Sequence, residues 1–226
     1  MNFNLIHNIR MEYRVFKEIY DTKNTLGEGG TGIVKEWCLN NCSTTKCNEC
    51  LKSVIKVIHC KLVDIQLMIR MFNLGEEYNL FPKFFKCYKY GDMYYVIMER
   101  VDNKGEINLN VLLRNSIYKL SMMHKLNICH KDLDRRNIVI CNNDIIFIDV
   151  DSCSYIQSDT DIIHDIKTLC ASLLFKLRKS DSIPKVRQSI SKVYDYDRNI
   201  MSIVKKHIKE FYRHDIALKA CNELVF

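Results

Sequence analysis

The sequence is poor in proline and glycine, with two prolines and seven glycines in 226 residues. This scarcity argues against long flexible linkers, because such segments depend on these two residue types. No apolar run approaches the length of a membrane-spanning helix, and residues 1–10 hold no sustained apolar segment of the secretory type. We therefore expect an intracellular, cytoplasmic protein without a membrane span.

Charge of one sign is not concentrated anywhere in the chain. The formal net charge is +7, but the 34 lysines and arginines are spread out and form no long basic run. Hydrophobic residues make up 47% and charged residues 27%, which is the balance of a folded globular protein and not of a disordered one. We expect a solvated basic surface, and no specific nucleic-acid motif is present.

The first half of the chain carries the pattern of an antiparallel sheet with one helix. Ile33–Trp37 and Ser53–Ile58 are β-branched segments, separated by a cysteine-rich stretch. Apolar residues at helical spacing predict a helix over 61–74, which we expect to end near Gly75. Tyr94–Met98 has the composition of a buried strand.

The second half is predicted to be mostly helical. Apolar residues recur at helical spacing over 109–123, 162–177 and 200–212. The polar segment 102–105 lies between the two halves and has the character of a hinge. A β-rich front and a helical back predict an α+β, two-lobed architecture.

A glycine-rich turn follows Leu26 and matches the pattern G-x-G-x-x-G-x-V. Such a turn lets the backbone approach a triphosphate closely, because no Cβ stands in the way. Its position between two predicted strands disfavours a Rossmann site, which needs a strand and a helix. The residues concerned are Gly27, Gly29, Gly30, Gly32 and Val34.

A second motif runs from His130 to Asn137 in the pattern H-x-D-x-x-x-x-N, and Asp149 follows it. Asp132 offers a carboxylate that can accept a hydroxyl proton. Asn137 and Asp149 offer an amide and a carboxylate that can share a divalent metal ion. Together these are the minimal chemistry of phosphoryl transfer.

Both motifs in this order resemble the eukaryotic-type protein kinase superfamily. The resemblance implies that ATP and Mg²⁺ are bound, with Asp132 as the catalytic residue and Asn137 and Asp149 as magnesium ligands. It also implies that the glycine-rich turn and Lys56 contact the phosphates of the nucleotide. His130 is expected to be structural and to pack beneath the loop.

The resemblance further implies a single kinase-like domain over 1–226. Its N-lobe would be 1–98 with a cysteine-rich insert at 38–50, its hinge 99–104 and its C-lobe 105–226. In the hinge, backbone groups of Glu99 and Val101 would hydrogen-bond the adenine edge.

Kinases pair the strand lysine with an acidic residue of a helix. For Lys56 the candidates are Asp64, on the predicted helix, and Glu76 or Glu77 after its expected end. We prefer Asp64 because the local sequence resembles that helix in several divergent kinases. An aspartate is one methylene shorter than a glutamate, so this pairing would be looser.

Two residues of the loop depart from the kinase pattern. Lys131 stands where an arginine is common. Asp134 stands where serine/threonine kinases usually have a lysine that contacts the γ-phosphate, and a carboxylate brings no positive charge to that group. Arg135 or Arg136 could supply the charge instead.

The segment after Asp149 is very short and lacks the A-P-E triplet of protein kinases. We match Asp165 to the aspartate that begins the helix after this segment. With so little activation loop, control by loop phosphorylation is not expected, and we hypothesise that the protein is constitutively active.

Four cysteines in the insert have the spacing C-x3-C-x4-C-x2-C. Four thiolates can close a tetrahedral zinc site, and a reduced cysteine-rich hairpin is the other possibility. Either role would be structural. The residues are Cys38, Cys42, Cys47 and Cys50.

The leading hypothesis is a compact, divergent ATP-dependent serine/threonine protein kinase with a protein substrate. The AT-rich type of composition suggests a large DNA virus as the source, in which case the protein would act in the host cytoplasm. A small-molecule phosphotransferase that resembles aminoglycoside or choline kinases is the first alternative. A pseudokinase that acts as a binding or decoy module, suggested by Asp134, is the second.

Overall fold

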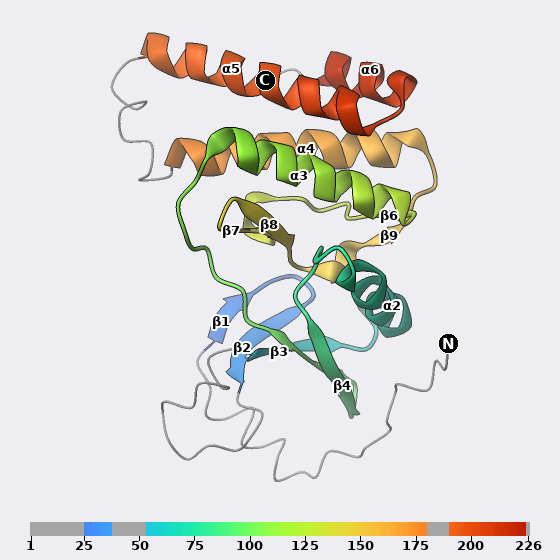
Figure 1. Cartoon of the computed structure of the whole chain (residues 1–226). Helices are drawn as coiled ribbons and strands as arrows, with labels where there is room; N and C mark the ends of the chain where they lie inside the picture. The colour runs from blue at the N-terminus through green and yellow to red at the C-terminus, as the bar shows by residue number, and fades with distance from the viewer. Residues whose placement is uncertain (1–24, 38–52, 180–189, 225–226) are drawn as a thin grey trace. The chain divides into compact units, whose positions relative to one another are not determined.

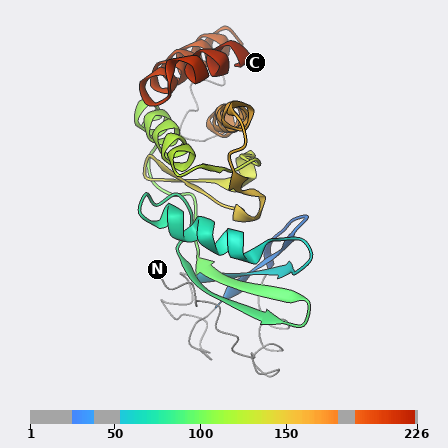
Figure 2. The same cartoon turned by 90° about the vertical axis from the view of Figure 1, so that its right-hand side faces the viewer.

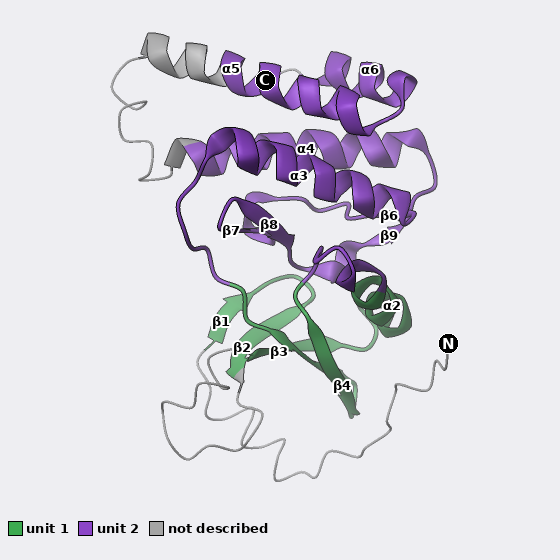
Figure 3. Cartoon of the chain, viewed as in Figure 1, with its two compact units in different colours: residues 1–73, 82–101 green, residues 74–81, 102–226 purple. Residues whose placement is uncertain are grey.

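The computed structural model describes residues 25–37, 53–179 and 190–224 (Figure 1). The chain divides into two compact units (Figure 3). The first contains residues 1–73 and 82–101, and the second contains residues 74–81 and 102–226.

The first unit is built on a five-stranded antiparallel sheet with the order β1-β2-β3-β5-β4. The three strands predicted from β-branched composition are confirmed as β2, β3 and β5, whereas β4 was not predicted. The bounds are β1 Thr25–Glu28, β2 Gly32–Trp37, β3 Ser53–His59, β4 Phe84–Tyr90 and β5 Met93–Glu99.

Register places Lys56 in the middle of this sheet. Lys56 lies opposite Val34 of β2 on one side and Val96 of β5 on the other. Because side chains alternate across a strand, Ile55 and Val57 face the other side of the sheet, where they form a buried cluster with β5 residues. β3 is thus buried on both faces, and Lys56 is only 6% exposed.

The helix of the first unit, α2, spans Ile65–Glu76 and starts later than the predicted 61–74. Asp64 explains the start, because its Oδ1 accepts hydrogen bonds from the N–H groups of Gln66 and Leu67 at 3.0 and 3.1 Å. The apolar face of α2 is buried, and Phe72 stacks on Phe84 of β4 with ring centroids 5.6 Å apart.

The described residues of the second unit form four helices, and the periodicity of the second half predicted three of them, α3, α4 and α5. The prediction over 200–212 covered only part of one helix, and the chain turns at Tyr212 before a further helix begins. The bounds are α3 Leu109–Lys125, α4 Asp159–Lys179, α5 Ile190–Phe211 and α6 His214–Glu223.

Short strands and turns connect these helices. β6 Ile128–Cys129 pairs with β9 Ser154–Tyr155, and β7 Ile138–Cys141 pairs with β8 Asp144–Phe147. The 3₁₀ turns η2 and η3 cover Arg135–Asn137 and Val150–Ser152. In the side view, α3 and α4 lie between these strands and the pair α5 and α6 (Figure 2).

Residues 74–81 belong to the second unit through specific polar contacts. The side chain of Lys119 in α3 is 7% exposed and forms an ion pair of 2.7 Å with Asp144. Its Nζ also donates to the carbonyl oxygens of Asn79 and Ile145, both at 2.8 Å. The N–H of Phe147 donates to the carbonyl of Leu80 at 2.9 Å. A buried ammonium is costly unless it is paired in this way.

Among the helices of the described ranges, none combines the length and the apolar character needed to cross a membrane.

Within the glycine-rich turn, stability should depend on Gly32, which lies close to β3. A Cβ at Gly32 would lie 2.2 Å from the carbonyl oxygen of Val57, whereas a Cβ at Gly30 would have no atom within 4 Å. We predict that Gly32→Ala lowers the free energy of unfolding by about 1–3 kcal/mol, the usual cost of overpacking. Gly30→Ala is the matched control and should change it by under about 0.5 kcal/mol. Urea unfolding measures both, and equal losses would contradict the packing argument.

Candidate active site

The loop from His130 to Asn137 is anchored at its start by a pair of short strands. Ile128 lies opposite Tyr155, and Cys129 lies opposite Ser154. The Sγ of Cys129 also contacts the Oγ of Ser154 at 3.2 Å. The beginning of the loop is therefore tied to the segment that follows Asp149.

A buried carboxylate then fixes the direction of the loop. Asp165 is 0% exposed, and it accepts hydrogen bonds from the N–H groups of His130 at 2.7 Å and of Lys131 at 2.9 Å. Lys131 has a φ of 66°, a left-handed conformation that non-glycine residues adopt only when something holds them there. Asp165 does not begin its helix as expected, since α4 starts at Asp159 and places Asp165 in its second turn.

His130 lies beneath the loop, in agreement with its expected structural role. Its Nε2 donates to the carbonyl oxygen of Ile148 at 3.0 Å, and its ring lies 6.0 Å from that of Phe147. Burial lowers the pKa of His130, which favours the neutral imidazole. Its Nδ1 has no hydrogen-bond partner among the described residues.

Asp132 and Asn137 are held against each other across the loop. The Nδ2 of Asn137 donates to the Oδ2 of Asp132 at 2.8 Å and to its carbonyl oxygen at 3.0 Å. Asn137 is 8% exposed, whereas Asp132 is only half-buried. With its amide nitrogen committed to Asp132, Asn137 has its amide oxygen left to act as a ligand.

The β7–β8 hairpin brings Asp149 next to Asn137. Ile138 lies opposite Phe147, and just before that pair the N–H of Ile148 donates to the carbonyl of Asn137 at 2.8 Å. Asp149 has a φ of 67°, so the chain turns sharply there. Within the described ranges no cluster of three or more His, Cys, Asp or Glu side chains is placed to hold a metal ion, so a site here would rest on one amide and one carboxylate.

Asp134 has a structural partner inside the loop. Its Oδ1 accepts from both the N–H and the Nε of Arg136, at 2.9 Å each. These hydrogen bonds, the backbone one first, lower the pKa of Asp134. Asp134 therefore caps the η2 turn and holds the Arg136 side chain.

The two arginines of the loop have different surroundings. The Arg135 guanidinium lies 3.8 Å from the ring centroid of Phe175 in α4, a cation–π contact. The Arg136 side chain is 81% exposed. Its pKa is raised, first by Asp134 and to a smaller degree by the charges of Asp132 and Asp149. The Arg136 guanidinium is thus close enough to Asp132 and Asp149 to interact with their charges.

In the first unit, the glycine-rich turn closes with a hydrogen bond of 3.0 Å from the N–H of Gly29 to the carbonyl of Gly32. Gly27 lies opposite Val34, and a Cβ at Gly27, Gly29 or Gly30 would meet open space. Three of the four glycines therefore leave their backbone open to an approaching group.

The acidic residues proposed to pair with Lys56 have other contacts in the structure. The carboxylate of Asp64 caps α2, as described above, and does not lie within the helix. Glu76 is the last residue of α2 and is exposed. Glu77 raises the pKa of Tyr78, and so lies beside that ring. The pairing of Asp64 with Lys56 stays a prediction.

The hinge begins where β5 ends. The N–H of Glu99 donates to the carbonyl of Lys83 at 2.8 Å, so this N–H is already used within the first unit. The N–H of Val101 donates to no other described residue. The chain passes from the first unit to the second between Val101 and Asp102.

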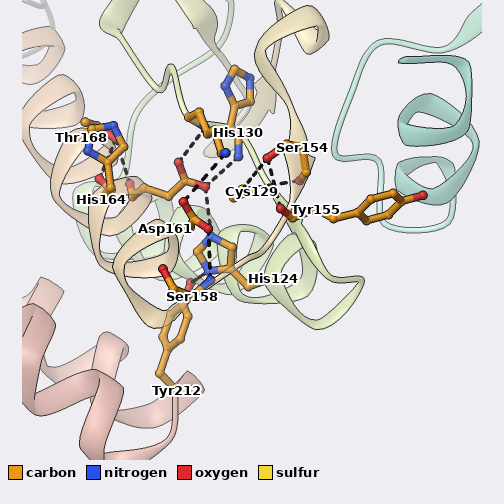
Figure 4. Close-up of polar contacts among 12 residues, drawn as sticks. His124, Cys129, His130, Ser154, Tyr155, Ser158, Asp161, His164, Thr168 and Tyr212 are labelled. Atoms are coloured by element: carbon orange, nitrogen blue, oxygen red, sulfur yellow. Dashed lines mark hydrogen bonds and ion pairs between the residues drawn. The ribbon is translucent and has the colours of Figure 1, made fainter. Parts of the chain in front are cut away.

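The segment between Asp149 and α4 is short, and strand pairing and hydrogen bonds hold it in place. It contains η3 and β9, and the N–H of Ile156 donates to the carbonyl of Asn127 at 3.1 Å. Asp161 accepts from the N–H groups of Gln157 and Ser158 at 2.8 and 3.2 Å. Figure 4 labels Ser158 and Asp161, and also Cys129 and Ser154, which pair at the start of the loop.

The four cysteines of the proposed zinc site, Cys38, Cys42, Cys47 and Cys50, lie outside the described residues. The seven cysteines within the described ranges are all free thiols.

Sequence reasoning missed two residues that support this site. Lys119 had no local signal, because a lysine on an amphipathic helix is usually solvated. Tyr212 was taken only as an apolar position of a helix, although its hydroxyl lies 3.0 Å from the Nδ1 of His124. Sequence spacing could not reveal the contacts of Lys119 or Tyr212, because the residues that they contact are distant in the sequence.

Comparison with known proteins gives a likeness in structure alone. No protein-family model matches the sequence, and no curated protein matches it. Among solved structures, an amicoumacin kinase in complex with AMP-PNP, Ca²⁺ and Ami is similar, with a TM-score of 0.60 and 12% sequence identity. The match covers 89% of this chain and 78% of that one. Taken with the two units described above, this likeness shows that the chain has an α+β, two-lobed protein kinase-like fold.

Proposed function

We propose that this protein transfers the γ-phosphoryl group of ATP to a hydroxyl group of its substrate. The observation that carries the proposal is the arrangement of Asp132, Asn137 and Asp149. Asp165 fixes the loop that holds the first two, and the β7–β8 hairpin sets the third beside them. The kinase-like fold supports the same chemistry.

In the reaction, Asp132 accepts the proton of the substrate hydroxyl. The hydroxyl oxygen forms a bond to the γ-phosphorus while the bond from that phosphorus to the β,γ-bridging oxygen breaks, and ADP leaves. The amide of Asn137 orients Asp132, because it donates to the Oδ2 of that carboxylate. His130 takes no proton, since it is buried and its Nε2 already donates to Ile148.

Asn137 and Asp149 offer the oxygen ligands that suit Mg²⁺. Bound there, Mg²⁺ would neutralise charge on the phosphates. The donor set fits a hard cation, because the amide nitrogen of Asn137 is held by Asp132 and its oxygen is left as the ligand. In the first unit, the glycine-rich turn and Lys56 are the proposed phosphate contacts, with Glu99 and Val101 for the adenine edge.

Two substrate classes are open. The loop sequence resembles that of serine/threonine protein kinases, which favours a protein hydroxyl. The small-molecule class is favoured by a specific observation, the short engaged segment between Asp149 and α4, which leaves few residues for docking a peptide. The same segment supports constitutive activity, because it is already ordered by β9 and needs no phosphate.

The contacts between Asn137 and Asp132 disfavour a decoy that only binds and has no catalytic activity. The hydrogen bonds between Asn137 and Asp132 orient a carboxylate, and a module that only binds has no chemical need of that orientation.

The proposed catalysis can be tested directly. Incubated with γ-labelled ATP and Mg²⁺, the wild type should label either generic proteins or a small hydroxyl compound from a panel of aminoglycosides and choline. Asp132→Asn should lower the rate by about 10²–10⁴, because general-base catalysis is lost. Asp92→Asn is the matched control, since Asp92 lies in the exposed turn between β4 and β5 and accepts the N–H of Cys60 through its backbone carbonyl.

Label in protein supports the first substrate class, and label only in the small compound supports the second. Nucleotide binding without any turnover in the wild type would contradict the proposed function.

A further prediction concerns Asp134, which stands where serine/threonine kinases usually have a lysine. We expect Arg136, held by Asp134, to supply positive charge to the transferring phosphoryl group. Arg136→Ala should then lower kcat by about 10–100-fold, as the loss of one charged donor to a transition state does. Arg135→Ala is the control and should stay within about twofold, because Arg135 stacks on Phe175.

A lysine at position 134 offers a rescue. The double variant Asp134→Lys with Arg136→Ala should recover most of the activity that Arg136→Ala loses. Equal effects of the two arginine substitutions, or a double variant no better than the single one, would rule out this role.

A further inference from the structure

A chain of buried hydrogen bonds runs from the C-terminal helices to the catalytic loop. Tyr212 follows α5, and its hydroxyl lies 3.0 Å from the Nδ1 of His124 in α3. The Nε2 of His124 lies 3.1 Å from the Oδ2 of Asp165 in α4. Asp165 in turn accepts from the N–H groups of His130 and Lys131. Figure 4 shows the contact between Tyr212 and His124.

The chemistry of the groups sets the direction of these bonds. A carboxylate only accepts, so the Nε2 of His124 carries the hydrogen that Asp165 receives. The Tyr212 hydroxyl has no other partner among the described residues, and burial raises its pKa well above the usual value, so it keeps its proton. With the hydroxyl as the hydrogen-bond donor and the Nδ1 of His124 as the acceptor, the contact selects the tautomer that carries its hydrogen on Nε2.

His124 is well placed to orient Asp165. Its side chain is 4% exposed, and its ring lies 5.7 Å from that of Tyr212. Asp165 divides its two oxygens between the loop amides: Oδ1 accepts from Lys131, and Oδ2 accepts from both His130 and His124. A rotation of the carboxylate would therefore weaken the hold on Lys131, whose left-handed conformation directly precedes Asp132.

Tyr212 occupies the one corner between the two last helices of the described chain. Its N–H donates to the carbonyl of Ile208 at 3.0 Å and ends α5, and the N–H of Ala217 donates to the carbonyl of Arg213 at 2.8 Å at the start of α6. The place of the hydroxyl is thus set by where α5 stops.

We infer that Tyr212 is a positioning residue for phosphoryl transfer, acting through His124 and Asp165 on the orientation of the loop that carries Asp132. This inference rests on the proposed function. In this role Tyr212 touches neither the nucleotide nor the reacting atoms. Its contribution is to keep the His124 ring in one tautomer and one orientation, so that Asp165 has a fixed direction.

The test is Tyr212→Phe, which removes one hydroxyl and keeps the ring. Loss of a buried hydrogen bond should lower kcat by about tenfold while KM for Mg-ATP stays within about twofold. Hydrogen exchange of the His130 and Lys131 amides, followed by NMR, should speed up by about tenfold for the same reason. The resonance of the hydrogen on the Nε2 of His124 should shift.

Tyr118→Phe is the matched control. Tyr118 lies on α3, is 42% exposed and packs its ring against Phe211, next to Tyr212. It should resemble the wild type in rate, amide exchange and the His124 resonance.

A double variant tests whether the effect passes through His124. In a His124→Gln background, adding Tyr212→Phe should change kcat by less than about twofold, because residues that act through one another are not additive. The inference would be overturned if Tyr212→Phe lowered kcat by the same factor with and without His124→Gln. It would also be overturned if the His130 and Lys131 amides exchanged at the wild-type rate in Tyr212→Phe alone. If the wild type turns over no ATP, the proposed function fails, and the exchange measurement still decides whether Tyr212 holds the loop.

Discussion

The buried carboxylate of Asp165 is the contact on which the arrangement of the second unit depends. It satisfies two backbone N–H groups at the sharp turn of Lys131, and it is itself satisfied by a histidine of α3. An unpaired buried carboxylate would be very costly. We therefore expect the hydrogen bonds of Asp165 to the loop and to α3 to break together and not one at a time. The second turn of α4 therefore determines the course of a loop more than thirty residues away in the sequence.

A buried lysine has a comparable role elsewhere in the same unit. Lys119 joins α3 to the segment 74–81 and to the β7–β8 hairpin through three contacts. Its ammonium has three N–H donors, and two carbonyls and one carboxylate accept from them, so no donor is left for water. The helix α3 thus presents a buried histidine and a buried lysine, both ionisable residues, to different parts of the unit.

Local pattern was enough to predict the elements whose periodicity is regular. The strands at Ile33–Trp37 and Tyr94–Met98 follow from their composition, and the helix over 109–123 follows from helical spacing. β4 was missed because a register shift between Phe84 and Lys86 interrupts its alternation. Spacing also placed the candidate site residues, through resemblance, but it could not show that Asp134 holds Arg136 or that Tyr212 reaches His124, 88 residues away.

The hairpin between β7 and β8 turns through two asparagines with positive φ, Asn142 at 51° and Asn143 at 63°. This is the geometry of a two-residue turn that allows only one register between its strands. A slip of one residue would put the opposite face of each strand forward, and it would break the hydrogen bond from the N–H of Ile148 to the carbonyl of Asn137 that sets Asp149 beside Asn137. A single residue inserted in this turn would therefore disturb the proposed magnesium ligands, which lie at the other end of the hairpin.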